Sequence, residues 1–258
     1  MSNCIVCGSS NTAFFHGVEN FKHEYFQVRG VLTEHYVPWD KCNDCGMIFT
    51  NPVPDTKKIF REAKGAYDFY KDMLDKNSEL LSNYKYPAEL LESWAKESGL
   101  EKTVIDMGMG PGILLGNLKN IGWRVYGIDI WPESVKFARE RFLDERECDT
   151  IACEDFTTDM VFNFVVSMEA LEHAYDPVKV LTTAYNTLDD KGYIFIQTQL
   201  YVDDYKDIED YLFQPGHISI FTFPVLEREM KKIGFKEIKE MKRKMPALIS
   251  ARRFNGAS

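Results

Sequence analysis

Two glutamates and two histidines give the chain its clearest candidates for reaction chemistry. Glu169, Glu172 and His173 lie close together in Glu-Ala-Leu-Glu-His, and His217 follows in the segment Gln214-Pro-Gly-His. On a helical turn, positions i, i+3 and i+4 share a face, so we expect the first three side chains to converge. Carboxylates and imidazoles suit Mn²⁺, Fe²⁺, Co²⁺ or Mg²⁺, and the nitrogen donors favour Mn²⁺ or Fe²⁺. The pattern predicts a divalent-metal site that leaves positions for substrate oxygens.

The same residues also support a metal-free interpretation. His173 or His217 is then a general base, because the pKa of an imidazole suits proton transfer at neutral pH. A purely packing role for His173 is a further alternative. We favour the metal-assisted interpretation and keep the others open.

Four of the six cysteines form two Cys-x-x-Cys-Gly pairs. The pairs are Cys4 with Cys7 and Cys42 with Cys45. Two such turns can direct four thiolates to one tetrahedral zinc ion, and the glycine after each pair permits the tight turn. We therefore expect a structural zinc site in a module over residues 1–50, with strands at 21–31 and 36–39. A redox role for the pairs is the alternative.

A glycine-rich turn follows a short apolar run that is typical of a buried strand. It contains Gly108, Gly110 and Gly112, and helical spacing resumes at Ile113. Glycine is required where the backbone takes a positive φ or approaches a ligand closely, and helix N-termini favour polar or anionic ligands. The stretch predicts a strand, a ligand-binding turn and a helix. A G-x-G-x-x-G dinucleotide fingerprint would need glycine at position 113, so a dinucleotide is disfavoured.

From residue 101 onward, short apolar strands alternate with amphipathic helices. This alternation predicts an α/β fold, a doubly wound and mainly parallel seven-stranded sheet with helices on both faces. In such a sheet the ligand binds beyond the carboxyl ends of the strands. Residues 51–100 are predicted to form a helical connector that covers this ligand site. The expected strands are 103–106, 124–129, 150–153, 162–167, 192–197, 235–243 and 247–254, and the expected helices are 112–120, 132–142, 178–188 and 223–233.

Composition narrows the class of partner. The chain of 258 residues carries a net charge of −9, which disfavours nucleic acid because phosphate contacts need Lys and Arg. No apolar run is long enough to cross a bilayer, and the first residues lack a signal-peptide pattern. We therefore expect a cytoplasmic protein with a small-molecule substrate. The sequence assigns neither an oligomeric state nor a role for Cys148 and Cys153.

The glycine turn and the carboxylates after it resemble the class I methyltransferases that use S-adenosylmethionine. The resemblance rests on Asp106-x-Gly-x-Gly-x-Gly112 and on Asp129, which ends the next expected strand. It implies that Asp129 accepts the ribose hydroxyls and that Asp155 meets the adenine amine. Asp106 is expected to brace the glycine loop or to hold a water molecule near the methionine end of the cofactor. The implied cofactor-binding residues are Asp106, Gly108, Gly110, Gly112, Asp129, Ile130, Asp155, Phe156, Met168 and Tyr67, with Tyr70 as a further candidate.

The pattern Glu169-x-x-Glu172-His173 is similar to the metal site of small-RNA 2′-O-methyltransferases and of some quinone-precursor O-methyltransferases. The small-RNA enzymes take a fourth ligand from the region where His217 lies. A zinc module joined to a methyltransferase also resembles bacterial sugar methyltransferases of natural-product and surface-glycan pathways.

These resemblances imply methyl transfer to an oxygen of a sugar, a nucleotide-linked sugar or a phosphorylated intermediate. RNA 2′-O-methylation is an alternative that the charge opposes, and a metal-independent small-molecule methyltransferase is a second. A non-enzymatic alternative is a cofactor-binding partner subunit that docks through its zinc module.

Overall fold

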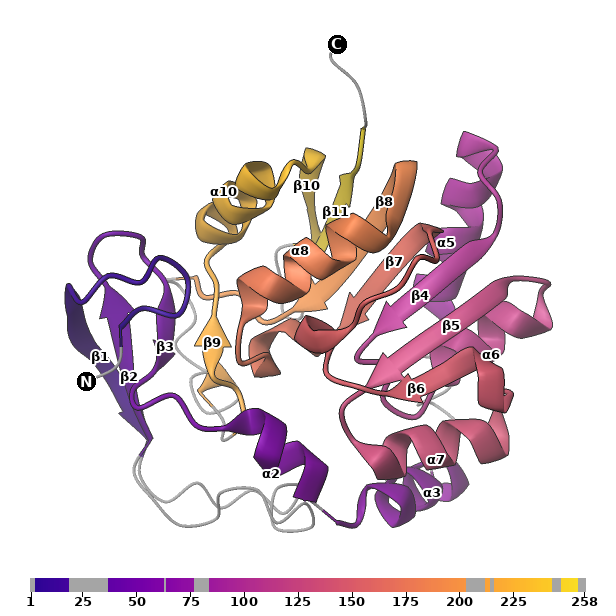
Figure 1. Ribbon diagram of the computed structural model, residues 1–258, viewed down its shortest axis with the longest axis horizontal. Helices are drawn as coiled ribbons and strands as arrows, with labels where there is room; N and C mark the ends of the chain where they lie inside the picture. The colour runs from indigo at the N-terminus through magenta and orange to yellow at the C-terminus, as the bar shows by residue number, and fades with distance from the viewer. Residues whose placement is uncertain are drawn as a thin grey trace.

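A central seven-stranded sheet organises the molecule (Figure 1). The computed structural model describes residues 3–18, 37–62, 64–76, 84–202, 212–213, 216–242 and 247–254. In spatial order the strands are β10 (Lys236–Lys242), β11 (Ala247–Arg252), β8 (Leu188–Thr198), β7 (Phe162–Met168), β4 (Thr103–Met107), β5 (Arg124–Asp129) and β6 (Cys148–Thr150). Strands β4 to β8 pair in parallel, whereas β11 is antiparallel to both its neighbours. The predicted α/β fold with a mainly parallel sheet is confirmed.

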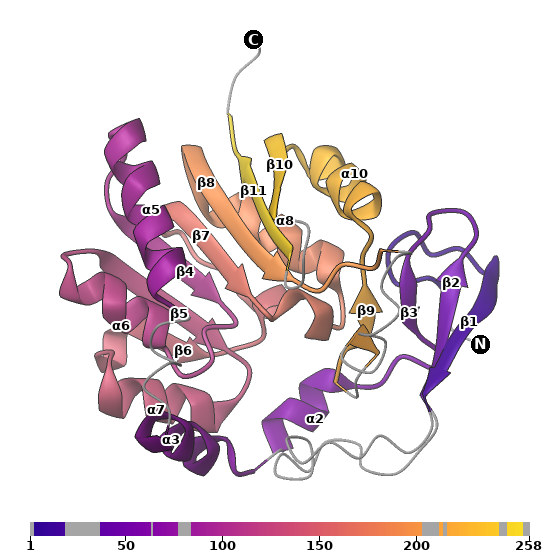
Figure 2. The ribbon, with the colours of Figure 1, turned by 180° about the vertical axis from the view of Figure 1, so that it is seen from behind.

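Helices cover both faces of this sheet because its central strands are apolar on both sides (Figures 1 and 2). Val104 of β4 belongs to the cluster on one face, with residues of α5 (Lys85–Ser98), α6 (Ile113–Asn120) and α7 (Pro132–Arg141). Its neighbour Ile105 belongs to the cluster on the other face, with residues of α8 (Pro177–Thr187) and α10 (Phe223–Ile233). Both side chains are fully buried. Among the described residues, every helix is too short or too polar to span a bilayer.

Two strand boundaries differ from the prediction. Strand β6 ends at Thr150, and the predicted strand at 150–153 instead leads into the 3-10 turn η2 (Cys153–Asp155). Strand β8 begins at Leu188, earlier than the predicted residue 192, because its polar first residues do not show the apolar pattern of a buried strand. The other expected strands and helices appear within a few residues of their predicted positions.

A second sheet of four antiparallel strands lies at the side of the first. It consists of β1 (Thr12–Val18), β2 (Val37–Cys42), β3 (Ile48–Thr50) and β9 (Ser219–Ile220). We call it the N-terminal sheet, although β9 comes from the segment that follows β8, and Figures 1 and 2 both show β9 beside β3. The predicted strand at 21–31 lies outside the described residues.

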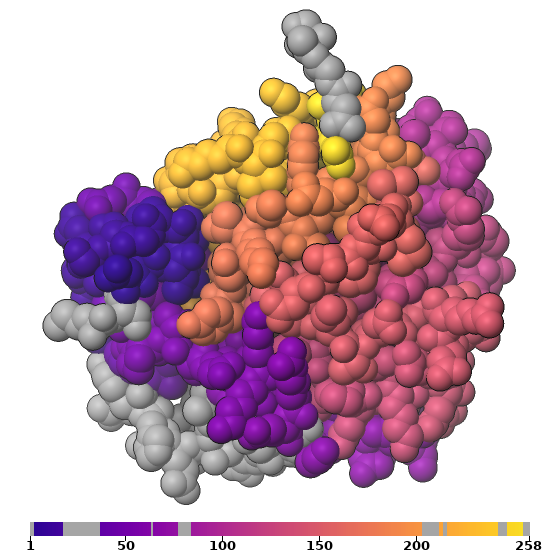
Figure 3. Space-filling model, in the orientation of Figure 1, coloured from indigo at the N-terminus to yellow at the C-terminus, as the bar shows by residue number. Residues whose placement is uncertain are grey.

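The N-terminal residues form a lobe at one edge of the molecule, next to α10 (Figure 3). Arg228 of α10 donates a hydrogen bond from Nη1 to the carbonyl of Cys45, at 2.9 Å. Gly46 lies against Val225, to which a Cβ at this glycine would approach within 3.4 Å. The lobe is therefore packed onto α10 of the α/β core, and the predicted module boundary at residue 50 stays a prediction.

Candidate active site

The glycine loop is fastened to the end of β5 by Asp129. One carboxylate oxygen of this buried residue accepts a hydrogen bond from the amide of Gly110, and the other accepts one from the amide of Trp131, each at 2.8 Å. Asp129 therefore links the glycine loop to the N-terminus of α7. Hydrogen bonds to an ionised carboxylate are stronger than neutral ones, so this residue fixes the shape of the loop.

Close packing explains why the loop needs glycine at its two ends. Gly108 has φ 87°, and a Cβ there would lie 2.4 Å from the Cβ of Ala170. Gly112 has φ 74°, and its Cβ would lie 2.8 Å from that of Ala138 on α7. Any other residue would be strained and would clash. Because Ala170 directly follows Glu169, the glycine loop packs against the turn that carries the candidate metal ligands.

Asp106 lies buried beneath the glycine loop. Its Oδ1 has no hydrogen-bond partner among the described residues. Burial, together with the negative charge of Asp129, raises the pKa of this carboxyl to about 8. A buried acceptor without a partner, close to a second carboxylate, suits a positively charged ligand or an ordered water molecule.

One helix near the carboxyl ends of the strands brings two tyrosines to this region. In α3 (Ala66–Lys76), the hydroxyl of Tyr67 donates to Glu140 of α7, and its ring packs edge-on against Phe137 at 5.3 Å. Tyr70 lies at the glycine loop, where a Cβ at Gly110 would be 3.6 Å from its hydroxyl oxygen. Cofactor contact by Tyr67 stays a prediction, whereas Tyr70 is the tyrosine that the structure places beside the loop.

The remaining predicted cofactor residues surround the same end of the sheet. Ile130 follows β5 and Met168 ends β7, and both are half-buried, whereas Phe156 is buried after η2. Asp155 accepts two hydrogen bonds from Nζ of Lys57, at 2.8 and 2.9 Å. Lys57 belongs to α2 (Thr56–Glu62), and its hydrogen bond lowers the pKa of Asp155. An adenine amine would share this carboxylate with a lysine, so its adenine role stays a prediction.

Three of the four predicted metal ligands meet at one point. Glu172, His173 and His217 each offer one ligand atom, and these atoms all lie within 4.8 Å of one another. Oε2 of Glu172 accepts a hydrogen bond from Thr198 at 2.8 Å, whereas its buried Oε1 has no partner among the described residues. Burial, and then the charge of Glu169, raises the pKa of Glu172 well above its usual range. A bound cation would give Oε1 of Glu172 a partner and would stabilise the ionised form of this carboxyl.

Backbone carbonyls orient both imidazoles of this cluster. Nδ1 of His173 lies 2.6 Å from the carbonyl oxygen of Gly216, and Nδ1 of His217 lies 2.9 Å from that of Leu212. A carbonyl only accepts, so each Nδ1 carries the proton and each Nε2 carries the lone pair of the neutral ring. This is the arrangement of metal-binding histidines. Burial lowers the pKa of His217 well below its usual range, which keeps the ring neutral.

Glu169 has a different environment from the other three residues. The predicted helical turn over 169–173 is wrong, because Glu169 has a left-handed backbone with φ 49° and the 3-10 turn η3 (Leu171–His173) begins two residues later. Its carboxylate accepts hydrogen bonds from Nε2 of Gln197, at 3.1 Å, and of Gln199, at 2.5 Å. Glu169 therefore lies beside Glu172 but outside the cluster of three, and its role as a metal ligand stays a prediction.

Sequence reasoning missed the two glutamines. Gln197 lies in β8 and Gln199 directly follows its last residue, Thr198, so the two side chains, two positions apart, point to the same side. Two amides with this spacing at the carboxyl end of a central strand are a signal that a buried polar partner lies nearby. The partner itself cannot be identified from the spacing.

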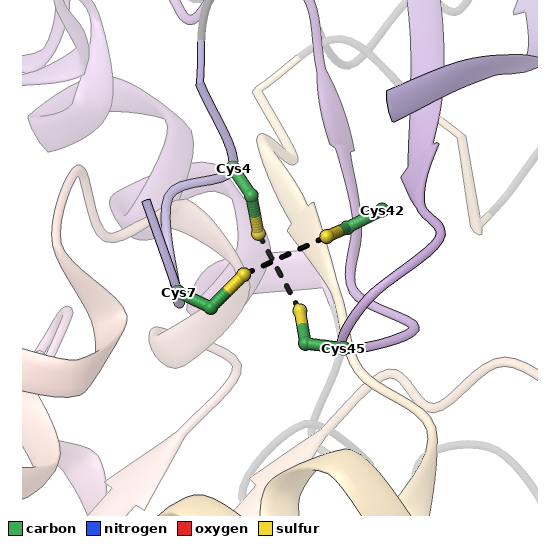
Figure 4. Close-up of side chains that lie close together, drawn as sticks. All are labelled: Cys4, Cys7, Cys42 and Cys45. Atoms are coloured by element: carbon green, nitrogen blue, oxygen red, sulfur yellow. Dashed lines mark hydrogen bonds between the residues drawn. The ribbon is translucent and has the colours of Figure 1, made fainter. Parts of the chain in front are cut away.

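The four predicted zinc ligands converge in the N-terminal lobe (Figure 4). The sulfur of Cys4 lies 3.5 Å from that of Cys45, and the sulfur of Cys7 lies 3.6 Å from that of Cys42. All four are free cysteines, and all four sulfurs lie within 4.8 Å of one another. Zinc–sulfur bonds of about 2.3 Å in a tetrahedron place sulfurs roughly 3.8 Å apart. The cluster therefore fits a tetrahedral zinc ion, as predicted from the two Cys-x-x-Cys-Gly pairs.

Comparisons with known proteins give a family and a fold. A family model described as a methyltransferase domain matches residues 79–240, more than half of the chain. The chain is 33% identical over 102 residues to the ubiquinone biosynthesis O-methyltransferase of Hydrogenovibrio crunogenus, a match that covers 38% of this chain and 42% of that protein. The alignment thus spans less than half of that relative.

Solved structures with a similar fold include an amino pentose methyltransferase of Micromonospora echinaspora, involved in calicheamicin biosynthesis and bound to S-adenosylmethionine. Its TM-score is 0.57 at 13% identity, covering 66% of this chain and 91% of that chain. DesVI of Streptomyces venezuelae has a TM-score of 0.56 at 15% identity, covering 73% of this chain and 97% of that chain. At these identities the similarity establishes the fold alone.

Proposed function

This chain belongs to the methyltransferase-domain family, and on that premise we propose that it transfers a methyl group from S-adenosylmethionine to an oxygen of a small polar metabolite, assisted by a divalent metal ion. The observation that carries the proposal is the contact between Gly108 and Ala170. This contact places the glycine loop against the turn that leads to Glu172 and His173. The proposed sites for the methyl donor and for the metal would thus share one end of the sheet.

The residues around the glycine loop fit the donor. S-adenosylmethionine supplies an activated methyl group on a sulfonium ion, and it also carries an ammonium group. The buried carboxyl of Asp129 would provide negative charge for such a ligand, and the positive charge of the ligand would favour the ionised form of the buried Asp106. Asp129 would hold the ribose hydroxyls while it keeps its hydrogen bond to Gly110, and the close-packed glycines leave the backbone exposed to the ligand.

The residues of the second site would hold the metal. Glu172, His173 and His217 supply one carboxylate and two Nε2 lone pairs, all oriented by hydrogen bonds to other groups. A divalent ion held there would lower the pKa of an acceptor hydroxyl. Phe60 of α2 lies edge-on against the ring of His173, with 5.7 Å between the ring centroids.

The names of the relatives and the net charge of the chain support a particular class of methyl acceptor. The curated relatives are named as O-methyltransferases, which supports oxygen as the receiving atom. A zinc module joined to a methyltransferase domain resembles bacterial sugar methyltransferases. This resemblance favours a sugar, a nucleotide-linked sugar or a phosphorylated intermediate as the acceptor, for example in the assembly of a surface glycan. The net charge of −9 disfavours an RNA substrate.

Metal analysis combined with an acceptor screen tests this proposal. We expect about one equivalent of zinc together with a second divalent ion in the purified protein. Glu172→Gln should lose the second ion and slow methyl transfer roughly a hundredfold or more, because a metal ion contributes several kcal/mol to such a reaction. S-adenosylmethionine binding, measured by calorimetry, should not change in this variant.

Two results would contradict the metal mechanism. They are a purified protein with zinc alone, and methyl transfer that continues at the same rate under a chelator that leaves the zinc in place. They would favour His173 or His217 as the general base, since the ring of each has its lone pair on Nε2.

A further inference from the structure

The segment that carries His217 is held by the N-terminal sheet. We propose that Thr50 and Trp39 of that sheet are positioning residues for His217, so that the second metal site requires an intact cysteine module. This inference rests on the metal-assisted function proposed above. The two residues act from opposite ends of the His217 segment.

The first link is a pair of backbone hydrogen bonds at Ile218, the residue after His217. Its amide donates to the carbonyl of Glu172 at 2.9 Å, and its carbonyl accepts from the amide of Thr50 at 3.0 Å. Strand β9 then pairs with β3, with Ile220 opposite Ile48. The backbone at His217 is thus fixed between the turn of Glu172 and the N-terminal sheet.

The second link lies at the other end of the segment. The carbonyl of Leu212 accepts the hydrogen bond that orients the His217 ring. Leu212 and Phe213 are buried in a cluster with Trp39, Ile48 and Ile220, and the rings of Trp39 and Phe213 meet edge-on at 5.2 Å. Trp39 therefore supports the residue whose carbonyl holds His217.

The cysteine cluster connects these contacts to zinc. Cys42 is the last residue of β2, and Cys45 lies three residues before β3, so the second cysteine pair closes the β2–β3 hairpin. Within it, the amide of Cys42 donates to Met47 and the amide of Gly46 donates to Cys42, each at 2.8 Å. Trp39 on β2 and Thr50 on β3 are directly opposite each other. Zinc bound to the cluster would hold this hairpin in shape.

The shape of the glycine loop is set by other elements than the N-terminal sheet. It is built on β4, β5 and α7, and Asp129 holds it independently of the N-terminal sheet. Damage to the hairpin should therefore weaken metal binding without weakening S-adenosylmethionine binding. That selectivity separates a positioning role from a general loss of folding.

Nuclear magnetic resonance of the histidine side chains tests the first link without any second metal. In zinc-loaded protein, the Nδ1–H of His217 should give a slowly exchanging signal, because it is buried and bonded to Leu212. Thr50→Pro removes the amide donor and should abolish this signal. Thr50→Val keeps the amide and loses only a hydroxyl that has no hydrogen-bond partner among the described residues, so it should retain the signal.

Titration with Mn²⁺, followed by electron paramagnetic resonance, tests the consequence. Thr50→Pro, Trp39→Ala and zinc-depleted parent should bind Mn²⁺ about ten- to a hundredfold more weakly, the usual effect of losing groups that orient metal ligands. Trp39→Phe keeps a ring against Phe213 and should bind like the parent. If Thr50→Pro does not fold, the two Trp39 variants decide the question.

The outcomes separate the two proposals. The positioning role is overturned if Thr50→Pro and Trp39→Ala, with zinc and S-adenosylmethionine still bound, keep both the His217 signal and the Mn²⁺ affinity of the parent. A parent that shows the signal, loses it in Thr50→Pro and binds no Mn²⁺ would support the positioning role and contradict the metal-assisted function.

Discussion

The proposed site has a methyl-donor side, formed by the glycine loop with Asp106 and Asp129, and an acceptor side, formed by Glu172, His173 and His217. The two sides are built in different ways. The glycine loop, Asp106 and Asp129 come from one continuous strand–loop–helix–strand unit, over residues 103–129, and Asp129 holds the loop directly. The candidate metal site instead joins η3 to His217, and His217 depends on a sheet whose other strands come from the N-terminus. We therefore expect the local unit to bind its ligand even when distant segments are disturbed, and the candidate metal site to lose its ion.

Replacing Asp129 should break the donor side and leave the acceptor side intact. We expect Asp129→Ala to weaken S-adenosylmethionine binding about a hundredfold, since hydrogen bonds to a charged group contribute about 1.5–3 kcal/mol each. Calorimetric titration measures this loss, and Mn²⁺ binding should be unchanged. Asp144→Ala, which removes an exposed carboxylate paired with Lys119, is the control. Parental affinity in Asp129→Ala would remove this residue from the cofactor site.

A methyl group at Gly108 should disturb both sides at once, because this is where they touch. In Gly108→Ala the new Cβ would meet Ala170 at 2.4 Å, so either the loop or the turn before Glu172 must move. We expect about a tenfold loss in the affinity for both S-adenosylmethionine and Mn²⁺.

Gly122 provides a matched control for this change. It has φ 88°, almost the same as Gly108, but a Cβ there would have nothing within 4 Å. Gly122→Ala therefore carries the backbone strain without the clash, and both affinities should match those of the parent. If Gly108→Ala weakens only one of the two ligands, the sides are less tightly packed together than the contact indicates.

The pH should affect the stability of the ligand-free protein through Asp106. The folded state raises the pKa of Asp106 to about 8, so in the ligand-free protein it binds this proton more tightly than the unfolded chain does. The stabilising contribution is complete below about pH 4 and is lost as the pH rises towards about pH 8.

Thermal unfolding across this pH range measures the effect. Between about pH 5 and about pH 8, the unfolding temperature of the ligand-free parent should fall by roughly ten degrees relative to Asp106→Asn. Bound S-adenosylmethionine should reduce the fall, because its positive charge favours the ionised carboxyl. A constant difference between the two proteins would show that Asp106 titrates in its ordinary range.

Much of the donor side was predictable because it depends on spacing within one segment. Gly108 and Gly112 both have positive φ and both pack too closely for a side chain. Asp129 ends β5, where the alternation of strand and helix predicted it. The cysteine pairs were predictable for the same reason, since each Cys-x-x-Cys turn sets its own geometry. Tyr70 shows the limit, because helical spacing does not reveal which tyrosine of α3 faces the loop.

The acceptor side was predictable in its residue types but not in its geometry. The single positive φ of Glu169 turns that carboxylate toward Gln197 and Gln199, and a helical pattern cannot predict such a change. The neighbours of His217 were also hidden, because β9 is only two residues long and pairs with a strand some 170 residues away. Such short strands have no hydrophobic pattern of their own.

The sequence by itself indicated which groups are candidates for binding and chemistry, namely a glycine loop, a carboxylate after the next strand, four thiols, and two glutamates with two histidines. Residue type and local spacing are sufficient for that, because they set backbone freedom and ligand chemistry. Only the tertiary structure decided which groups meet. That outcome depends on the burial of distant segments against one another, which brought Thr50, Trp39 and His217 into one unit and left Glu169 bonded to two glutamines.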